Sequence, residues 1–329
     1  MTRALITGIS GFVGSHLAEY LLAKTDWEII GMCRWRSPLD NIQPLIPEIN
    51  KGGRVRLVYA DLRDGIAVRE AVKQANPTHV FHLAAQSYPK TSFTSPLDTL
   101  DTNVQGTVRL LGALRTSDAE IHVCSSSEVY GRAKTIPIAE DAPFHPASPY
   151  AVSKVGADLM ARHYAEAYGM RIQVTRMFTH TGPRRGDVFA ESSFAKQIAM
   201  IEAGLIPPVV KVGNLKSLRT IADVRDAVRA YHMLLTVNPQ PGAYYNIGGS
   251  HTCTVGDILN TLLSMSAVKI GIEVDPGRLR PVDADLQVPD CTKFKNHTGW
   301  RPMIPFEQTM ADLLAYWRDQ VKRGAPLQR

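Results

Sequence analysis

The sequence predicts an α/β protein in which a doubly wound, mostly parallel sheet is followed by a smaller, mainly helical C-terminal region. In the first half of the chain, short apolar segments typical of strands alternate with helical patterns, as they do in βαβ units. A glycine-rich turn lies directly between the first strand and the first helix. After Thr179 this alternation ends, and loops rich in glycine, proline and arginine separate the remaining patterns.

The elements of the first half can be placed in order. Strand and helix patterns succeed each other at 3–8, 15–24, 27–34, 54–62, 67–75, 79–85, 103–114 and 121–127. The next helix has a start signal in Ser148 followed by Pro149, and a stop signal in Gly169. A further buried strand is predicted at 171–178.

The second half predicts a separate region. It contains a loop at 179–189, a helix at 193–204, an extended segment at 207–214, a helix at 220–236, and mainly helices from 252 to 323 around a loop at 275–290. We therefore expect a main domain at 1–178, to which a segment at about 215–250 returns. Residues 179–329 are expected to form the smaller, substrate-binding region.

Composition and charge limit the classes of function. Hydrophobic residues make up 44% and charged residues 21% of the chain, as in ordinary soluble globular proteins. No apolar run approaches the roughly 20 residues that span a bilayer, and "MTRALITG" runs into a strand without a signal sequence, so we expect a cytoplasmic protein without a membrane partner. The basic residues behind the net charge of +6 are dispersed, which favours a polyanionic small molecule over a nucleic acid.

The cysteines and histidines indicate no metal site. The four cysteines form no Cys-x-x-Cys pair and lie far apart, at Cys33, Cys124, Cys253 and Cys291. We expect reduced thiols, with neither disulfides nor zinc. The ten histidines show no helical metal-ligand spacing.

The turn "TGISGFVGSH" predicts a dinucleotide site. Gly8, Gly11 and Gly14 stand between a strand and a helix, where glycine lets the backbone approach a pyrophosphate at the helix N-terminus. Phe12 and Val13 lie in the same turn. Because the turn begins a βαβ series, we interpret the first domain as a Rossmann-type fold rather than reading the turn as a plain strand-to-helix connection.

The residues that follow the next strands favour NADP as the cofactor. NAD usually needs an acid after the second strand, whereas arginine accommodates the extra phosphate of NADP. This chain has Arg34 and Arg36 there and no acid; two solvated loop arginines are the alternative. Asp61 is a candidate for a contact with the edge of the cofactor's adenine ring. Further cofactor-binding candidates follow the third and fourth strands, at Leu62, Leu83, Ala84 and Ala85.

Tyr150 and Lys154 are candidates for proton transfer. They stand four residues apart, about one helical turn, on a helix that Ser148 and Pro149 begin. Free tyrosine has a pKa of about 10, so a tyrosine base near neutral pH needs a neighbouring cation. Lys154 is placed to supply it, although an amphipathic helix with a surface lysine would give the same spacing.

With the glycine turn, "HLAAQS", "CSSSEVYG" and the Tyr150-x-x-x-Lys154 pair in this order, the whole chain resembles the extended short-chain dehydrogenase/reductases that act on nucleotide sugars. The resemblance implies that Tyr150 is the catalytic acid/base. It implies that Lys154 lowers the pKa of Tyr150 and holds the nicotinamide ribose. Ser126 would hydrogen-bond the reacting oxygen.

Within that superfamily the chain most resembles GDP-mannose 4,6-dehydratases and GDP-4-keto-6-deoxy-mannose reductases. "AAQSYPKTSFTSPLDTLDTNVQGTVRLLGALR" and "GPRRG" are similar to the dehydratase, and "FAKQI", "KVGNL" and "TGWRPMIP" are similar to the reductase.

A dehydratase oxidises carbon 4, removes the carbon 5 proton and expels the carbon 6 hydroxyl, so it needs a second acid/base. Ser126-x-Glu128 resembles the dehydratase arrangement, which makes Glu128 that candidate; a loop carboxylate bonded to backbone amides is the alternative.

The resemblance also implies a binding site for the GDP-sugar. Its candidate residues are Ser87, Thr179, Arg184, Arg185, Lys196, Val212, Asn214, Arg219, Arg280 and Asp283. Arginine forks match phosphate oxygens. Thr179 and Asp283 depart from the asparagine and glutamate that the family usually carries. The loop after the second strand looks shorter than in tetrameric dehydratases, so we expect a homodimer, with a tetramer as the alternative.

The leading hypothesis is an NADP-dependent GDP-mannose 4,6-dehydratase. The alternatives are an NADPH-dependent reductase of the 4-keto product, a nucleotide-sugar epimerase, and a non-catalytic dinucleotide-sensing protein. The last of these has no need for Ser126, Tyr150 and Lys154 together.

Overall fold

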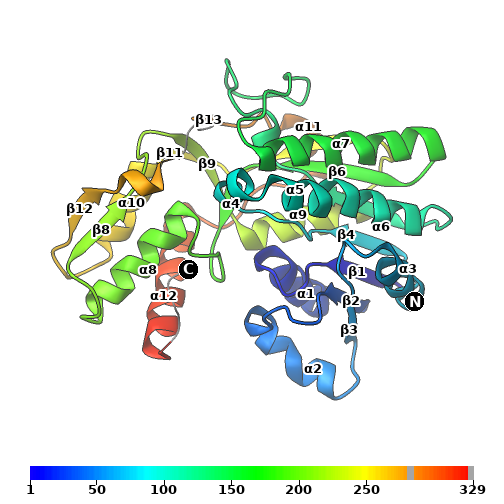
Figure 1. Cartoon of the computed structure of the whole chain (residues 1–329), viewed down its shortest axis with the longest axis horizontal. Helices are drawn as coiled ribbons and strands as arrows, with labels where there is room; N and C mark the ends of the chain where they lie inside the picture. Colours follow the sequence, from blue (N-terminus) through cyan, green and yellow to red (C-terminus); the bar gives the residue numbers. More distant parts are fainter. Residues whose placement is uncertain (280–284, 325–329) are drawn as a thin grey trace.

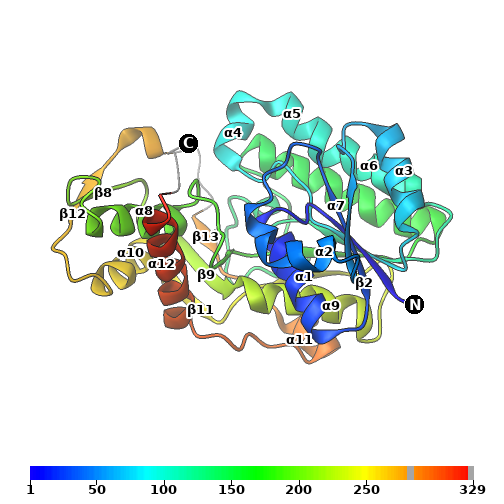
Figure 2. The ribbon, with the colours of Figure 1, turned by 90° about the horizontal axis from the view of Figure 1, so that it is seen from below.

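The computed structural model describes residues 1–279 and 285–324 and shows a main domain with a smaller region beside it (Figure 1). The main domain has three layers, a central sheet with helices on both faces, which Figure 2 shows from a second side. Seven parallel strands form the sheet in the order β10-β6-β5-β4-β1-β2-β3. Their bounds are β1 (Arg3–Thr7), β2 (Glu28–Cys33), β3 (Val55–Tyr59), β4 (His79–His82), β5 (Glu120–Cys124), β6 (Ile172–Met177) and β10 (Tyr244–Ile247). The parallel α/β class predicted from the sequence is confirmed.

Two apolar clusters hold the helices against the two faces of the sheet. On one face lie α3 (Gly65–Ala75), α6 (Gly106–Leu114) and α7 (Pro149–Tyr168), and on the other lie α1 (Phe12–Lys24) and α9 (Val224–Thr236). Strands covered on both faces are apolar along their whole length, and β1 accordingly buries Ala4, Leu5 and Ile6 completely. Shorter elements of this domain are η1 (Asp40–Leu45), α2 (Ile46–Asn50), α4 (Pro89–Thr94), α5 (Pro96–Leu100), η2 (Asp101–Gln105), η3 (Ser127–Val129) and α11 (Thr292–Thr298).

The strand order positions the site. β1 lies between β4 and β2, so successive crossovers run toward opposite edges of the sheet from this point. Open parallel sheets bind ligands outside the carboxyl ends of their strands at such a reversal. The turn after β1 and the loops after β4 and β5 therefore face one crevice.

The smaller region combines helices and short strands. Helices α8, α10 and α12 pack into one apolar cluster. Its elements are β7 (His180–Thr181), α8 (Ala190–Glu202), β8 (Val209–Val212), β9 (Leu218–Asp223), β11 (His251–Thr254), α10 (Val255–Ser264), β12 (Gly271–Val274), η4 (Pro276–Arg278), β13 (Leu286–Gln287) and α12 (Phe306–Lys322). Between them the chain returns to the main domain, where α9 packs on α1 and β10 pairs with β6.

One predicted helix begins later than the sequence indicated. The pattern at 220–236 was interpreted as a single helix, but residues Leu218–Asp223 form β9 and the helix begins at Val224. β9 pairs with β11 in antiparallel register, and this long-range pairing stabilises an extended conformation. Asp223 then caps α9, because its side chain accepts a hydrogen bond from the Arg225 N–H.

Helix α7 has the predicted ends. The Ser148 side chain accepts a hydrogen bond from the Ala151 N–H, Pro149 is the first helical residue, and Gly169 ends the helix with φ +64°. The helix is tied to β6 by an ion pair of 2.8 Å between the buried side chains of Arg176 and Asp158. Tyr150 and Lys154 therefore stand on a helix fixed at both ends and in its middle.

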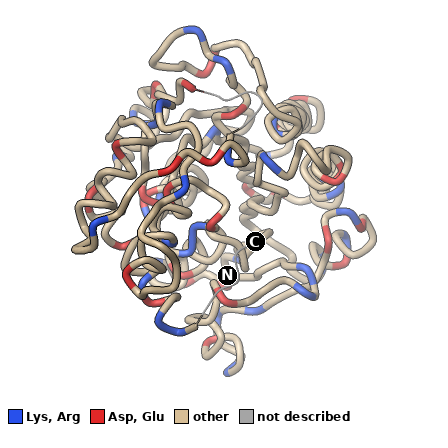
Figure 3. The backbone as a smooth tube through the Cα atoms, turned by 60° about the vertical axis from the view of Figure 1, so that its left-hand side comes forward, with Lys and Arg blue, Asp and Glu red and all other residues tan. Residues whose placement is uncertain are grey.

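Charge is dispersed over the molecule. Figure 3 shows Lys and Arg interspersed with Asp and Glu along the backbone. No helix in residues 1–279 and 285–324 is long and apolar enough to cross a membrane. Within the same two ranges no group of His, Cys, Asp and Glu side chains could hold a metal ion. The four cysteines are free.

Candidate active site

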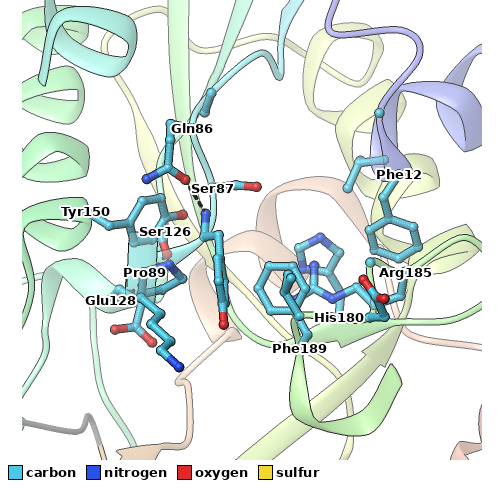
Figure 4. Close-up of a pocket in the computed structure, with 18 of the residues that line it drawn as sticks. Phe12, Gln86, Ser87, Pro89, Ser126, Glu128, Tyr150, His180, Arg185 and Phe189 are labelled. Carbon is cyan, nitrogen blue, oxygen red and sulfur yellow. Dashed lines mark hydrogen bonds between the residues drawn. The ribbon is translucent and has the colours of Figure 1, made fainter. Parts of the chain in front are cut away.

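A cavity of about 910 Å³ lies at the carboxyl ends of the main-domain strands and extends to the smaller region. Figure 4 shows Phe12 and Arg185 at one side of it and Ser126, Glu128 and Tyr150 at the other. Residues of both the predicted cofactor turn and the predicted substrate loops line this cavity.

The glycine turn is shaped for close approach of a phosphate. Gly8 has φ +76°, and a Cβ added at Gly14 would lie 2.2 Å from the carbonyl oxygen of Gly8. Side chains are therefore excluded on both sides of the turn. Gly11 caps α1 in an extended conformation, so the helix N-terminus opens toward the cavity that Gly11, Phe12 and Val13 line. These residues fit the pyrophosphate of a dinucleotide.

The two predicted arginines occupy different places after β2. Arg34 lines both the main cavity and an adjoining shallow cavity, whereas Arg36 lines only the adjoining one, together with Trp35 and Tyr59. Asp61 borders both cavities, and a hydrogen bond from Arg63 lowers the pKa of its carboxyl. The remaining cofactor candidates all line the main cavity, namely Leu62, Leu83, Ala84 and Ala85.

Ser126, Glu128, Tyr150 and Lys154 all line the same cavity. The Glu128 N–H donates to the Ser126 hydroxyl at 3.2 Å, and this bond fixes the short turn η3 that follows β5. The Lys154 ammonium donates to the carbonyl oxygen of Cys124 at 2.8 Å. Two elements, the end of β5 and the start of α7, thus bring the four predicted catalytic residues together.

The pKa of Tyr150 differs from the sequence-based expectation. Burial raises it above the ordinary value of 10, and outweighs the hydrogen bond with Ser126 and the charge of Arg185, which both lower it. Burial also lowers the pKa of Lys154. The net shift is therefore upward, because removal of the phenol from water is the largest effect. The expectation that Lys154 lowers the pKa of Tyr150 stays a prediction.

Arg185 lies at the cofactor turn and not only near substrate loops. Its guanidinium lies 3.4 Å from the ring centroid of Phe189 and 5.3 Å from that of Phe12, and it pairs with Glu191 at 3.3 Å. Burial lowers its pKa, and its charge in turn lowers the pKa of Tyr150. The resemblance implied a place at the GDP group; in the structure Arg185 lies between Phe189 and Phe12 of the predicted cofactor turn, and its role in binding substrate stays a prediction.

His180 is a cavity residue that the sequence analysis missed. Its ring stacks on Phe12 at 5.8 Å and 10°, and its Nδ1 is 3.1 Å from the carbonyl oxygen of Phe178. Burial lowers its pKa to about 4, so the ring is neutral and Nδ1 carries the proton. Nε2 is buried and has no partner among the described residues. Its position just after β6, where the other strand ends carry site residues, was the available signal.

Two predicted substrate residues do not line the cavity. Arg184, with φ +70°, turns toward α1 and pairs with Glu19 at 2.7 Å. Val212 is completely buried in the apolar cluster of the smaller region. Neither is a cavity residue in the described part of the chain.

The other predicted substrate residues take different positions. Five line the cavity: Ser87, Thr179, Lys196, Asn214 and Arg219. The Lys196 ammonium pairs with Asp187 at 2.7 Å. A substrate phosphate would therefore bind this ammonium either beside the Asp187 carboxylate or in its place. Arg280 and Asp283 lie outside the described residues.

The parallel sheet, the glycine turn and the Tyr150–Lys154 helix define the class of nucleotide-sugar enzymes within the extended short-chain dehydrogenase/reductases. A profile of the GDP-mannose 4,6 dehydratase family matches residues 5–313. On the strength of that match over most of its length, the chain belongs to this family.

The similar proteins include both a dehydratase and a reductase. The chain is 33% identical to GDP-mannose 4,6-dehydratase of Yersinia enterocolitica, over 99% of this chain and 96% of that one. It is 31% identical to GDP-6-deoxy-D-mannose reductase of Pseudomonas aeruginosa, over 97% and 98% of the two chains. The solved structure of RMD from Pseudomonas aeruginosa, complexed with NADPH, matches with a TM-score of 0.81 at 30% identity over 97% and 100%.

Proposed function

We propose that the protein is an NADP-dependent GDP-mannose 4,6-dehydratase, a lyase that forms GDP-4-keto-6-deoxy-mannose. The observation that carries the proposal is the position of Glu128, which lines the same cavity as Ser126 and Tyr150. A reductase needs one acid for its ketone, whereas elimination of water needs a second acid/base. Family membership and the similarity to the Yersinia dehydratase support the choice.

Each catalytic side chain has a separate task. Tyr150 accepts the proton of the sugar's carbon 4 hydroxyl, and the Ser126 hydroxyl donates to the oxygen that becomes the ketone. Glu128 removes the proton from carbon 5 and delivers a proton to the carbon 6 hydroxyl, which leaves as water. The buried charge of Arg185 favours the phenolate of Tyr150. A bound nicotinamide would supply the redox chemistry, as acceptor of the hydride from carbon 4 and as its donor to carbon 6, and the proton that Tyr150 took from the carbon 4 hydroxyl would return to carbon 5.

NADP is the proposed cofactor because arginine side chains that follow β2 line both cavities. Arg34 lines both cavities and Arg36 the adjoining one, and guanidinium forks suit a 2′-phosphate. The glycine turn fits the pyrophosphate, and Lys154, which lines the same cavity, is our candidate for holding the nicotinamide ribose. The NADPH-complexed neighbour supports the same choice.

The test is product analysis after incubation of the purified protein with GDP-mannose and no added reductant. We expect a 4-keto-6-deoxy sugar nucleotide. Glu128→Gln should abolish its formation without changing NADP binding, whereas Glu166→Gln, at an exposed position on α7, should leave it unchanged. A fully active Glu128→Gln variant would remove Glu128 from its proposed role.

The reductase is the second candidate, and the similarity to the Pseudomonas reductase favours it. Consumption of NADPH with the 4-keto sugar, without a product from GDP-mannose, would select it. A nucleotide-sugar epimerase and a non-catalytic dinucleotide-sensing protein remain the further alternatives. The sensing role is disfavoured because Ser126, Tyr150 and Lys154 share one cavity.

A homodimer is the proposed assembly. Exposed apolar side chains lie on adjacent helices, with Leu97 on α5 79% exposed and Val152 and Leu159 on α7 49% and 46% exposed. A second copy of the chain that covers these helices would bury them. Size-exclusion chromatography with light scattering tests the dimer against the monomer and tetramer. The cytoplasmic location stays a prediction.

A further inference from the structure

Lys90 joins the two parts of the molecule at the cavity. Its ammonium donates to the carbonyl oxygen of Gly277 at 2.8 Å, and the two residues are 187 positions apart in the chain. Lys90 belongs to α4, which stands on the side of the main domain that faces the smaller region (Figures 1 and 2). Lys90 and Gly277 both line the cavity, so their hydrogen bond crosses the space where substrate and protein meet.

The Gly277 side of this bond is held firmly by the smaller region. Arg278 donates to the Ser193 hydroxyl of α8 at 3.0 Å. The same turn packs on Gly213, where an added Cβ would lie 2.8 Å from the carbonyl oxygen of Arg278. Lys90 is exposed and has a long flexible side chain. Lys90 is therefore the partner that can move.

The acceptor that Lys90 contacts differs from the acceptors of the neighbouring cavity cations. Lys196 pairs with Asp187 and Arg185 with Glu191. In the described part of the chain, the acceptor recorded for the Lys90 ammonium is a neutral peptide carbonyl. A phosphate oxygen carries a negative charge, so it attracts the ammonium more strongly than a neutral carbonyl oxygen does. An incoming diphosphate would thus offer Lys90 a better acceptor than Gly277 does.

We propose that Lys90 is a substrate-binding residue that leaves the Gly277 carbonyl and donates to the diphosphate of the nucleotide sugar. The proposal rests on the proposed function for the substrate class. Ser193, which anchors the Gly277 turn, lies three residues before Lys196 on α8. Lys90 thus approaches from the main domain the part of the cavity that Arg278 and Lys196 reach from the smaller region. One ammonium then links substrate binding to the contact between the two parts.

The experiment measures the binding of GDP, GDP-mannose, guanosine and NADP to the full chain by calorimetry. Lys90→Met should weaken GDP and GDP-mannose by about tenfold, the order expected for loss of one charged hydrogen bond. Guanosine has no phosphate, so its affinity should not change, and NADP binding should report an intact fold. Lys90→Arg should retain most of the affinity. The matched control is Lys73→Met, which removes an exposed lysine of α3 outside the cavity.

The outcomes separate this proposal from the proposed function. Wild-type affinity for GDP in Lys90→Met overturns the diphosphate role, and so does an equal loss for guanosine. In the assay of product formation, the variant should raise KM for GDP-mannose while kcat changes little. If the wild-type protein binds GDP but forms no 4-keto product, the dehydratase assignment fails while the Lys90 result still stands.

Discussion

The buried histidines behind the active site make stability depend on pH. The Nε2 of His122 lies 2.8 Å from the Thr175 hydroxyl, and its Nδ1 is buried without a partner among the described residues. Burial, followed by the charges of His82 and Lys154, lowers the pKa of His122 to about 3. Burial lowers the pKa of His82 to about 3 as well. Both imidazoles are therefore neutral in the folded protein at pH 5.

The magnitude follows from the proton bound by the unfolded chain. Unfolded histidine has a pKa of about 6.5, so between pH 7 and pH 5 it takes up a proton that the folded state refuses, at about 1.36 kcal/mol per pKa unit. Each of His82 and His122 should thus remove about 2 kcal/mol from the free energy of unfolding over this range. The stability is fully present above pH 6.5 and is lost as the pH falls toward 3.

Urea unfolding at pH 7, 6 and 5, followed by circular dichroism, tests this reasoning on His122→Gln. Glutamine can bond to Thr175 but cannot titrate, so the variant should lose about 2 kcal/mol less than the wild type between pH 7 and 5. The comparison is made within each variant, which removes any constant packing defect. His163→Gln, at an exposed position on α7, should lose as much as the wild type. An identical pH dependence in His122→Gln and wild type would refute the reasoning.

Three further predictions concern the cofactor turn, the core and cofactor choice. Gly14→Ala should sharply weaken NADP binding in calorimetry, because the new Cβ would lie 2.2 Å from a backbone oxygen of the turn; Gly112→Ala, where an added Cβ would meet no atom within 4 Å beyond its own helix, is the control with unchanged affinity. Arg176→Met should lower the free energy of unfolding by about 3 kcal/mol in urea, because it leaves the buried Asp158 carboxylate with only the 3.7 Å ion pair to Arg162; a loss below about 1 kcal/mol would contradict the buried-pair account. Arg34→Ala should weaken NADP by about tenfold to a hundredfold, as loss of a charged hydrogen bond implies, and leave NAD almost unaffected. Equal losses for both cofactors would defeat the assignment of Arg34.

The features that the sequence predicted well are those with local causes. Ser148, Pro149 and Gly169 determine the ends of α7 through a side-chain cap, a fixed φ and a left-handed residue. The glycine turn is equally local, since its spacing alone excludes side chains from one surface. These two elements carry Tyr150, Lys154 and the predicted cofactor contacts, so much of the candidate site could be placed before the structure.

The features that the sequence predicted poorly depend on distant partners. Residues 220–223 read as the start of a helix because nothing in their own pattern records the pairing of β9 with β11. Arg184 and Arg185 are adjacent and chemically identical, yet one pairs with Glu19 on α1 and the other packs on Phe12 at the cavity. Arg184 has a positive φ, and no sequence pattern specifies such a backbone conformation for a non-glycine residue.

The same distinction applies to the reaction. Tyr150 and Lys154 would serve a reductase as well as a dehydratase, because both enzymes move one proton at carbon 4. Glu128 is different, since the task we propose for it exists only if water is lost. The hydrogen bond from its N–H to Ser126 places this carboxylate on the turn that also carries the hydroxyl for the carbon 4 oxygen. Under the proposed function, the choice between the two reactions therefore depends on η3 and not on the helix that carries the tyrosine.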